Sequence, residues 1–87
     1  MSKADEIFVS NMKEILETVI NNLVDDPKSV HINQVDGEQS IVFEVKVADS
    51  DMGKVIGKQG VIAKSIRTIM KAAAAKENKR VSVEFLD

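Results

Sequence analysis

Residues 41–47 carry an apolar side chain at every second position, and a period of two is typical of a β-strand with one buried face. The side chains on that face are Ile41, Phe43, Val45 and Val47. The β-rich run 30–35 is separated from this strand by the turn signal Asp36-Gly37. These features predict an antiparallel hairpin, with the more apolar 41–47 strand at the centre of the sheet.

A long helix is predicted before the hairpin. Between residues 5 and 25, apolar side chains recur at steps of three and four, which is the helical period. Ser2 or Asp5 can cap the start of this helix, and Pro27 requires it to stop.

The chain after the hairpin predicts two more helices and a final strand. Asp49, Ser50 and Asp51 offer N-caps for a short helix through Ile56, and the segment 57–60 breaks it. A third helix follows from about residue 61 to 75. Its apolar face comprises Ile62, Ile66, Ile69, Met70 and Ala73. The last strand covers residues 80–86, and one side of it carries Val81, Val83 and Phe85.

The resulting order, α-β-β-α-α-β, restricts the topology. The two middle helices form a crossover, so the last strand is expected to run parallel to the 41–47 strand. We therefore expect an α+β fold, with a three-stranded mixed sheet and the helices packed on one face. A length of 87 residues suits one domain, so residues 1–87 are expected to form it.

The composition excludes several functional classes. The chain has no cysteine, which excludes disulfides and thiolate metal sites. His31 has no second histidine to form a metal site with, and no cofactor is expected. No apolar run approaches the ~18 residues that a membrane span needs. Residues 1–6 lack a signal pattern, so a cytoplasmic location is expected.

The charge is distributed unevenly along the chain. Residues 1–51 carry 4 basic and 11 acidic side chains, whereas residues 52–87 carry 8 basic and 3 acidic ones. The net charge of −2 hides this difference. A polyanion would be attracted to the second half of the chain and repelled by the first.

The segment between the second and third predicted helices is the best candidate for a binding site. Gly57 and Gly60 bracket two polar residues, which permits a tight reversal and removes Cβ atoms from the path of a ligand. The loop leads into the N-terminus of a helix, where free N–H groups favour an anion. Lys58 at the tip, with Lys54 and Lys64 nearby in sequence, adds positive charge. A phosphodiester is the anion that this arrangement suits.

At these residues the sequence resembles the K-homology (KH) RNA-binding domain. The residues that match its signature, two branched apolar residues, Gly-x-x-Gly and a following helix, are Val55, Ile56, Gly57, Gly60, Lys64, Ile66 and Arg67. Ala63 departs from the pattern, since the family usually has a larger apolar residue there. The element order resembles the type II KH arrangement, and the chain is most similar to the small bacterial single-KH proteins called KH-domain protein A.

The resemblance implies a groove that holds about four single-stranded nucleotides, with their backbone at the Gly-x-x-Gly loop. The RNA-binding residues it implies are Lys54, Val55, Ile56, Gly57, Lys58, Gln59, Gly60, Ile62, Lys64 and Arg67. It also implies a non-enzymatic role in RNA chaperoning, post-transcriptional control and cell-shape regulation. The implied partners are a second copy of the chain or another KH-containing protein. The alternative is a protein–protein adaptor that uses a KH-like fold to dimerise and binds little RNA.

Other interpretations of the same residues are weaker. The segment 53–58 resembles a P-loop, but it has three residues between its glycines instead of four. Gln59 also stands where a P-loop needs Ser or Thr to hold magnesium. Lys71 is expected to be a solvated side chain. Phe8, Phe43 and Phe85 fall on predicted core faces, which argues against a platform of exposed aromatic residues for stacking bases.

Overall fold

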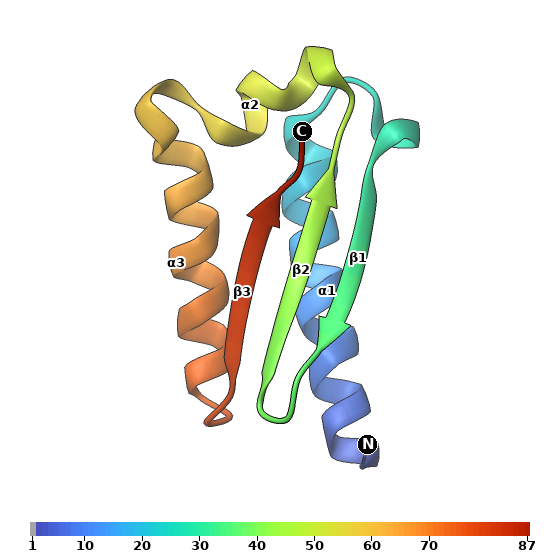
Figure 1. Cartoon of the computed structure of the whole chain (residues 1–87), viewed down its shortest axis with the longest axis vertical. Coiled ribbons are helices and arrows are strands. Elements are labelled where there is room, and N and C mark those ends of the chain that lie inside the picture. The colour runs from blue at the N-terminus through green and yellow to red at the C-terminus, as the bar shows by residue number, and fades with distance from the viewer. Residues whose placement is uncertain (1) are drawn as a thin grey trace.

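The computed structural model describes residues 2–87 (Figure 1). The helices are α1 (Lys3–Leu23), α2 (Met52–Ile56) and α3 (Val61–Ala75), and the strands are β1 (His31–Asp36), β2 (Ser40–Lys46) and β3 (Arg80–Phe85). Short 3₁₀ turns occupy Pro27–Ser29, Asp49–Asp51 and Lys58–Gly60. The predicted order α-β-β-α-α-β is confirmed. Met1, the first residue of the predicted domain 1–87, lies outside the described residues.

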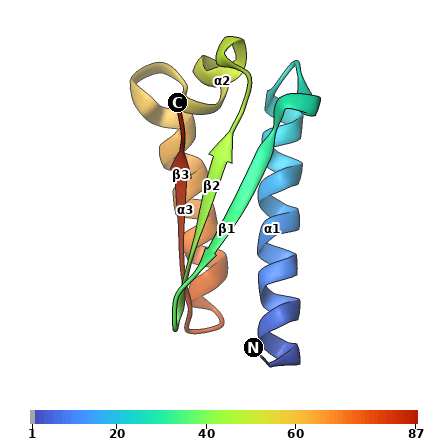
Figure 2. The ribbon, with the colours of Figure 1, turned by 45° about the vertical axis from the view of Figure 1, so that its right-hand side comes forward.

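Strand β2 is at the centre of the sheet, as predicted, with the order β1-β2-β3. β1 pairs with β2 in the antiparallel sense, and β3 pairs with β2 in the parallel sense that a helical crossover requires. The hairpin closes where the Gly37 N–H donates to the Ser40 carbonyl at 2.7 Å. Figures 1 and 2 show α1 and α3 on the same side of the sheet. The predicted α+β fold, a mixed sheet with helices on one face, is confirmed.

The hydrophobic core lies between the sheet and the two long helices. Phe43 and Val45 of β2 are fully buried, and so are Leu16 and Ile20 of α1. Burial alternates along β2 from Ile41 onward, which confirms the predicted period of two. Each side chain of this kind stabilises the fold by about 1.5–3 kcal/mol when it leaves water.

Helix α1 is capped as the sequence predicts. The Ser2 hydroxyl accepts a hydrogen bond from the Asp5 N–H at 3.1 Å. The helix ends at Leu23, and Pro27 then opens a 3₁₀ turn. α1 spans 21 residues, yet neither it nor any other helix among residues 2–87 is long and apolar enough to cross a membrane.

The buried side of α3 differs from the prediction at Ile69, which is 53% exposed. The side chains that α3 buries are Ala63, Ile66, Met70 and Ala74. Ile69 lies about 100° around the helix from Met70, at the margin of this stripe. The prediction placed Ile69 on the buried face only because its side chain is apolar. In the structure, α3 packs through a row of residues that includes the small side chains of Ala63 and Ala74.

Asp51 has a different role from the predicted helix cap. No side-chain hydrogen bond caps α2, so the expected N-cap role of Asp49, Ser50 and Asp51 is wrong. The Asp51 carboxylate instead accepts the backbone N–H groups of Asp25 at 3.1 Å and Asp26 at 3.0 Å. Its exposure is 1%, and it is the only buried polar or charged side chain within residues 2–87. The short segment after α1 is thereby joined to the start of α2.

These hydrogen bonds predict an acid-dependent loss of stability. The bond from the Asp25 N–H, with that from Asp26, lowers the pKa of Asp51 below its ordinary 3.8. The charged carboxylate therefore stabilises the fold above pH 3.8, and this contribution is lost as the pH falls through the lowered pKa. We expect Asp51→Asn to lower the thermal midpoint by roughly 10 °C at neutral pH, since one N–H loses its acceptor.

The measurement is the circular-dichroism melting midpoint of both proteins from neutral to strongly acidic pH. The two curves should approach each other below pH 3.8, where Asp51 becomes protonated in the unmodified chain. Asp49→Asn, which removes an exposed carboxylate two residues away, is the matched control and should change little. A difference between Asp51→Asn and the unmodified chain that stays constant at every pH would contradict the interpretation.

Candidate nucleic-acid interface

The Gly57–Gly60 loop connects α2 to α3 through backbone conformations with positive φ. Gly57 has φ 78° and ψ 171°, and Gly60 has φ 76° and ψ 13°. Gln59 between them also has a positive φ of 57°. The Gly57 N–H donates to the Gly53 carbonyl at 2.9 Å and ends α2, while the Gly60 N–H donates to the Gly57 carbonyl at 3.1 Å. The chain therefore reverses within four residues.

The two glycines are required for different reasons. A Cβ atom on Gly57 would lie 2.6 Å from the Ile62 Cγ1 and 2.9 Å from its backbone nitrogen. A Cβ atom on Gly60 would meet nothing within 4 Å. Gly57 thus allows the loop to pack against the start of α3, whereas Gly60 leaves open space over the loop. That open space is where the backbone of a ligand can approach.

The exposed end of α3 is suited to an anion. Gly60 is the N-cap of this helix, and no side chain caps it. The first turn contains no acidic residue. Lys58, Gln59 and Lys64 are all exposed around it. The helix dipole and the uncapped N–H groups therefore face a surface with net positive charge.

The apolar residues beside the loop differ in burial: one lies in the core beneath the loop, and two are partly exposed beside it. Val55 is fully buried in the core, so it can support the loop only from beneath. Ile56 and Ile62 are half-buried and present part of their surface next to the loop. Ala63, the departure from the KH pattern, is 2% exposed and belongs to the packed side of α3.

Lys54 makes an internal ion pair. Its ammonium group bonds to the Asp25 carboxylate and lies 3.5 Å from the Asp51 carboxylate. The hydrogen bond to Asp25 raises the pKa of Lys54 above its ordinary value. Part of the Lys54 charge is therefore neutralised within the protein, and the side chain joins α2 to the segment after α1.

Arg67 lies between α3 and the free edge of β3. Its Nε–H donates to the Val83 carbonyl at 3.0 Å, and its guanidinium lies 5.5 Å from the centre of the Phe85 ring. The sequence predicts Arg67 as a binding residue, but it does not predict these two partners. The predicted parallel crossover places α3 beside β3, and Arg67 lies less than two turns from the start of α3. These two facts are the features of the sequence from which a contact between Arg67 and β3 could have been predicted.

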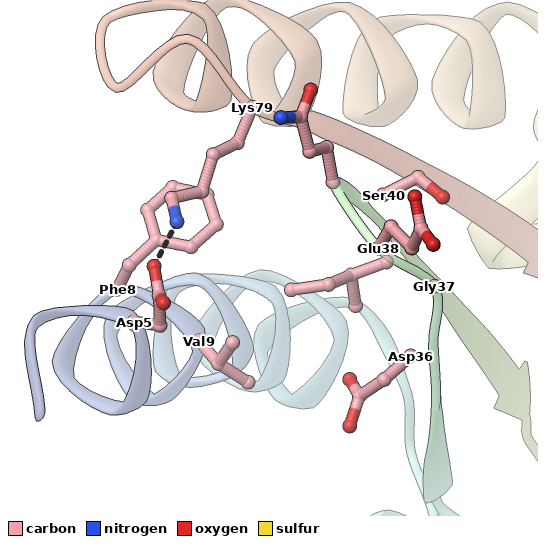
Figure 3. A pocket seen from close by; sticks show the side chains of 10 residues that line it. Asp5, Phe8, Val9, Asp36, Gly37, Glu38, Ser40 and Lys79 are labelled. Carbon is pink, nitrogen blue, oxygen red and sulfur yellow. Dashed lines mark hydrogen bonds and ion pairs between the residues drawn. The ribbon is translucent and has the colours of Figure 1, made fainter. Parts of the chain in front are cut away.

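A cavity of about 280 Å³ lies elsewhere in the fold (Figure 3). It is formed by the start of α1, the β1–β2 turn and the α3–β3 turn. Lys79 pairs there with Asp5 and lies 5.3 Å from the centre of the Phe8 ring. Asp36 and Glu38 add negative charge to its wall. This cavity would repel phosphate, and its ion pair joins two elements of the fold.

The sequence is similar to known proteins over most of its length. Residues 13–85 match the family described as KhpA/KhpB, KH domain. The chain belongs to the KhpA/KhpB KH-domain family. It is 64% identical to the RNA-binding protein KhpA of Clostridium acetobutylicum over 86% of this chain and all of that protein. It is 46% identical to the RNA-binding protein KhpA of Borreliella burgdorferi over 88% of this chain and 94% of that protein.

Membership of the KhpA/KhpB family confirms the resemblance found in the sequence. The RNA-binding protein KhpA of Chlamydia trachomatis is 43% identical over 87% of this chain. These are bacterial RNA-binding proteins, and the family is not one of enzymes. Within residues 2–87, no group of histidine, aspartate and glutamate side chains could hold a metal ion.

The different surroundings of the two glycines generate a prediction about stability. Gly57→Ala should destabilise the fold by more than about 2 kcal/mol, because its backbone conformation suits only glycine and the new methyl group meets the Ile62 backbone. Gly60→Ala should cost only about 1–2 kcal/mol, the strain of a left-handed residue in open space. Urea unfolding measures both values.

Gly60→Asn serves as the control, since asparagine tolerates the left-handed conformation better than alanine. It should be more stable than Gly60→Ala. If Gly57→Ala were as stable as Gly60→Asn, the predicted steric conflict between a side chain at position 57 and Ile62 would be contradicted.

Proposed function

We propose that residues 1–87 act as a single KH-like domain that binds single-stranded RNA at the Gly57–Gly60 loop. The observation that carries the proposal is the conformation of that loop: two glycines with positive φ open onto the uncapped, basic start of α3. A KH loop of this kind holds the backbone of about four nucleotides. The similarity to proteins named RNA-binding protein KhpA supports the same conclusion.

The contacts follow from where each side chain lies. The exposed loop residues Lys58 and Gln59, with Lys64 on α3, would meet phosphates. The bases would lie over Ile56 and Ile62, which are half-exposed beside the loop. Because apolar contact and phosphate attraction read little sequence, we expect weak base preference.

The remaining predicted residues contribute indirectly or from the far side of the groove. Val55 supports the groove from the core, and Lys54 positions α2 through its pair with Asp25. Arg67 presents its guanidinium at the edge of β3, next to Phe85. We assign these residues to the RNA site as supporting or flanking groups.

We further propose that the protein pairs with a second KH-fold chain, either a copy of itself or another KH-containing protein. Four nucleotides give a small interface, and pairing raises the overall affinity through effective concentration. Ile15 on α1 is 38% exposed and lines a cavity of about 590 Å³ with Val19 and Ala73. Ile69 on α3 is 53% exposed and precedes Ala73 by one helical turn, which places the two on the same side of α3. We propose that a second chain would cover these apolar side chains.

An RNA-binding domain that pairs and tolerates many sequences suits an RNA chaperone or post-transcriptional regulator in the bacterial cytoplasm, where its RNA targets would be found. Cell-shape regulation would then be an indirect result of this action on RNA. A protein–protein adaptor with little RNA binding is the second candidate. The exposed apolar surface at Ile15 and Ile69 is the observation that favours it.

The double substitution Lys58→Asp with Gln59→Asp tests the RNA site. It places two carboxylates where phosphates must approach, so affinity for a short single-stranded RNA should fall at least roughly tenfold, or about 1.4 kcal/mol. Both side chains are exposed, so the thermal midpoint should change little. A fluorescence titration with a labelled oligouridine measures the affinity.

The matched control is Lys3→Asp with Ser10→Asp. It makes the same change in net charge on exposed side chains in the first half of α1, which lies toward the end of the molecule opposite the loop (Figure 1). Its affinity should stay within about twofold of the unmodified protein, because screening weakens interactions beyond ~10 Å. Equal losses in both double variants would show that diffuse charge binds the RNA. Unchanged binding in the loop variant would mean that the RNA site lies elsewhere, and an unmodified protein that does not bind RNA would favour the adaptor.

Pairing has its own test in Ile15→Glu. The substitution places a charge on the exposed apolar surface, so a dimer that uses this surface should dissociate, while the folded chain loses little stability. Sedimentation velocity at increasing protein concentration measures the change. The charge-neutral exchange Thr18→Ser on the same surface is the control. A dimer that survives Ile15→Glu must use another surface.

A further inference from the structure

The free edge of β1 lies on the opposite side of the sheet from α3 and the Gly57–Gly60 loop (Figure 1). We infer that this edge is a second self-association surface, at which β1 of one chain pairs in the antiparallel sense with β1 of another copy. The two three-stranded sheets would then form one sheet of six strands. The inference goes beyond the proposed function, because it uses neither the RNA site nor the apolar residues Ile15 and Ile69.

Half of the β1 backbone is available for this pairing. In an antiparallel pair of strands, residues that bond to the partner strand alternate with residues whose N–H and carbonyl face away from it. The Gly37 N–H donates to the Ser40 carbonyl, which fixes this alternation along the register of β1 with β2. The residues that bond to β2 are His31, Asn33 and Val35. Those that direct their N–H and carbonyl to the free edge are Ile32, Gln34 and Asp36.

Strand β1 lacks the features that protect many edge strands from pairing. Its six residues include no proline, glycine or lysine, and its register with β2 runs without a bulge. Asp36, the only acidic residue of the strand, stands at its last position. An edge of this kind is a template on which another strand can pair.

The alternation of side chains restricts how two copies of β1 can pair. The helices of both chains lie on one face of the joined sheet only if odd-numbered residues lie opposite odd-numbered ones. A twofold axis at Asn33 meets this condition. It places Ile32 of each chain opposite Gln34 of the other, and the N–H and carbonyl of both residues face the free edge. Each of these two symmetric pairs can therefore exchange both backbone hydrogen bonds.

Helix α1 brings two charged side chains to the same edge. A cavity of about 300 Å³ beside the start of β1 is lined by residues that include Lys13, Glu17 and Asn21 of α1 and His31 and Ile32 of β1. In the described part of the chain, Lys13 and Glu17 make no ion pair. Both residues are half-buried. Opposite charges at this edge are therefore available to a partner.

A second copy of the chain would supply that partner. The start of α1 lines a cavity with Asp36, whereas the middle of α1 lines the one with His31. The middle of β1 is therefore close to the level of residues 13–17 of α1. A twofold axis at Asn33 turns the second α1 end for end about this level, so Lys13 of each chain lies near Glu17 of the other. This charge complementarity favours a second copy over an unrelated extended peptide.

The β1 edge is distinct from the surface that contains Ile15. Ile15 is two residues from both Lys13 and Glu17, and a step of two residues turns an α-helix by about 200°. Ile15 therefore faces away from the β1 edge, and it lines a cavity with Ala73 of α3. Two self-association surfaces on opposite sides of α1 would allow assembly beyond a dimer.

The test uses two charge reversals, Lys13→Glu and Glu17→Lys, each made in the full chain with Ile15→Ser. Ile15→Ser removes the large apolar side chain of the other surface without adding a charge. Sedimentation velocity should show that the Ile15→Ser chain still associates, and that either reversal weakens association at least roughly tenfold through like-charge repulsion. An equimolar mixture of the two reversed chains should associate again, because each then meets the opposite charge at both positions.

A backbone variant and a charge control complete the test. Gln34→Pro removes the edge-facing N–H of residue 34 and leaves the hydrogen bonds to β2, so it should abolish association while the circular-dichroism spectrum stays folded. Lys71→Glu and Glu77→Lys make the same charge reversals at exposed residues of α3 and the turn after it. They should change association by less than about twofold, because they lie across the sheet from β1 (Figure 1).

Three results would overturn the inference. An Ile15→Ser chain that is monomeric at every concentration would leave the Ile15 surface as the site of pairing and exclude the β1 edge. Association that is insensitive to both Lys13→Glu and Gln34→Pro would exclude it as well. A mixture of the two reversed chains that fails to associate would contradict the twofold arrangement. RNA binding at the loop is measured separately, so none of these results decides the proposed function.

Discussion

The carboxylate of Asp51 bonds to two consecutive backbone N–H groups, those of Asp25 and Asp26, across more than twenty residues of sequence. A buried charge is costly unless hydrogen bonds satisfy it, and this one is satisfied by the segment that follows α1. The contact fixes the start of α2 against the end of α1. The position of the Gly57–Gly60 loop follows, because α2 is only five residues long and leads directly into it.

A second contact acts at the opposite end of α1. Lys79 in the turn before β3 pairs with Asp5 and lies over the Phe8 ring. Lys54 makes the corresponding pair with Asp25 near the end of α1 that faces the loop. The acidic first half and the basic second half of the chain are thus joined by ion pairs at both ends of one helix. Part of the charge asymmetry therefore stabilises the fold, and the basic residues that remain exposed give the surface of the second half its positive charge.

The candidate site contains both kinds of basic residue, those held by partners within the protein and those left exposed. Of the basic residues near the loop, Lys54 is paired internally and Arg67 is bonded to the Val83 carbonyl, while Lys58 and Lys64 are exposed. Paired residues fix the shape of the site, and exposed ones set its charge. The same distinction separates Val55, which supports the loop from within the core, from Ile56, which is partly exposed at the protein surface. A residue list taken from a motif combines both kinds, although they respond to substitution for different physical reasons.

The sequence by itself determined the elements, their order and the loop. The alternation in 41–47 predicted the central strand, the crossover predicted the parallel pairing of β2 with β3, and the glycines at 57 and 60 marked the reversal. Only the tertiary structure decided that Asp51 bonds to the segment after α1, that Lys54 is paired, and that Ile69 is exposed. The reason is that periodicity and turn residues act within one segment, where neighbours are fixed by the covalent chain. Partners of a polar side chain, and the face that a helix buries, depend on how distant segments pack.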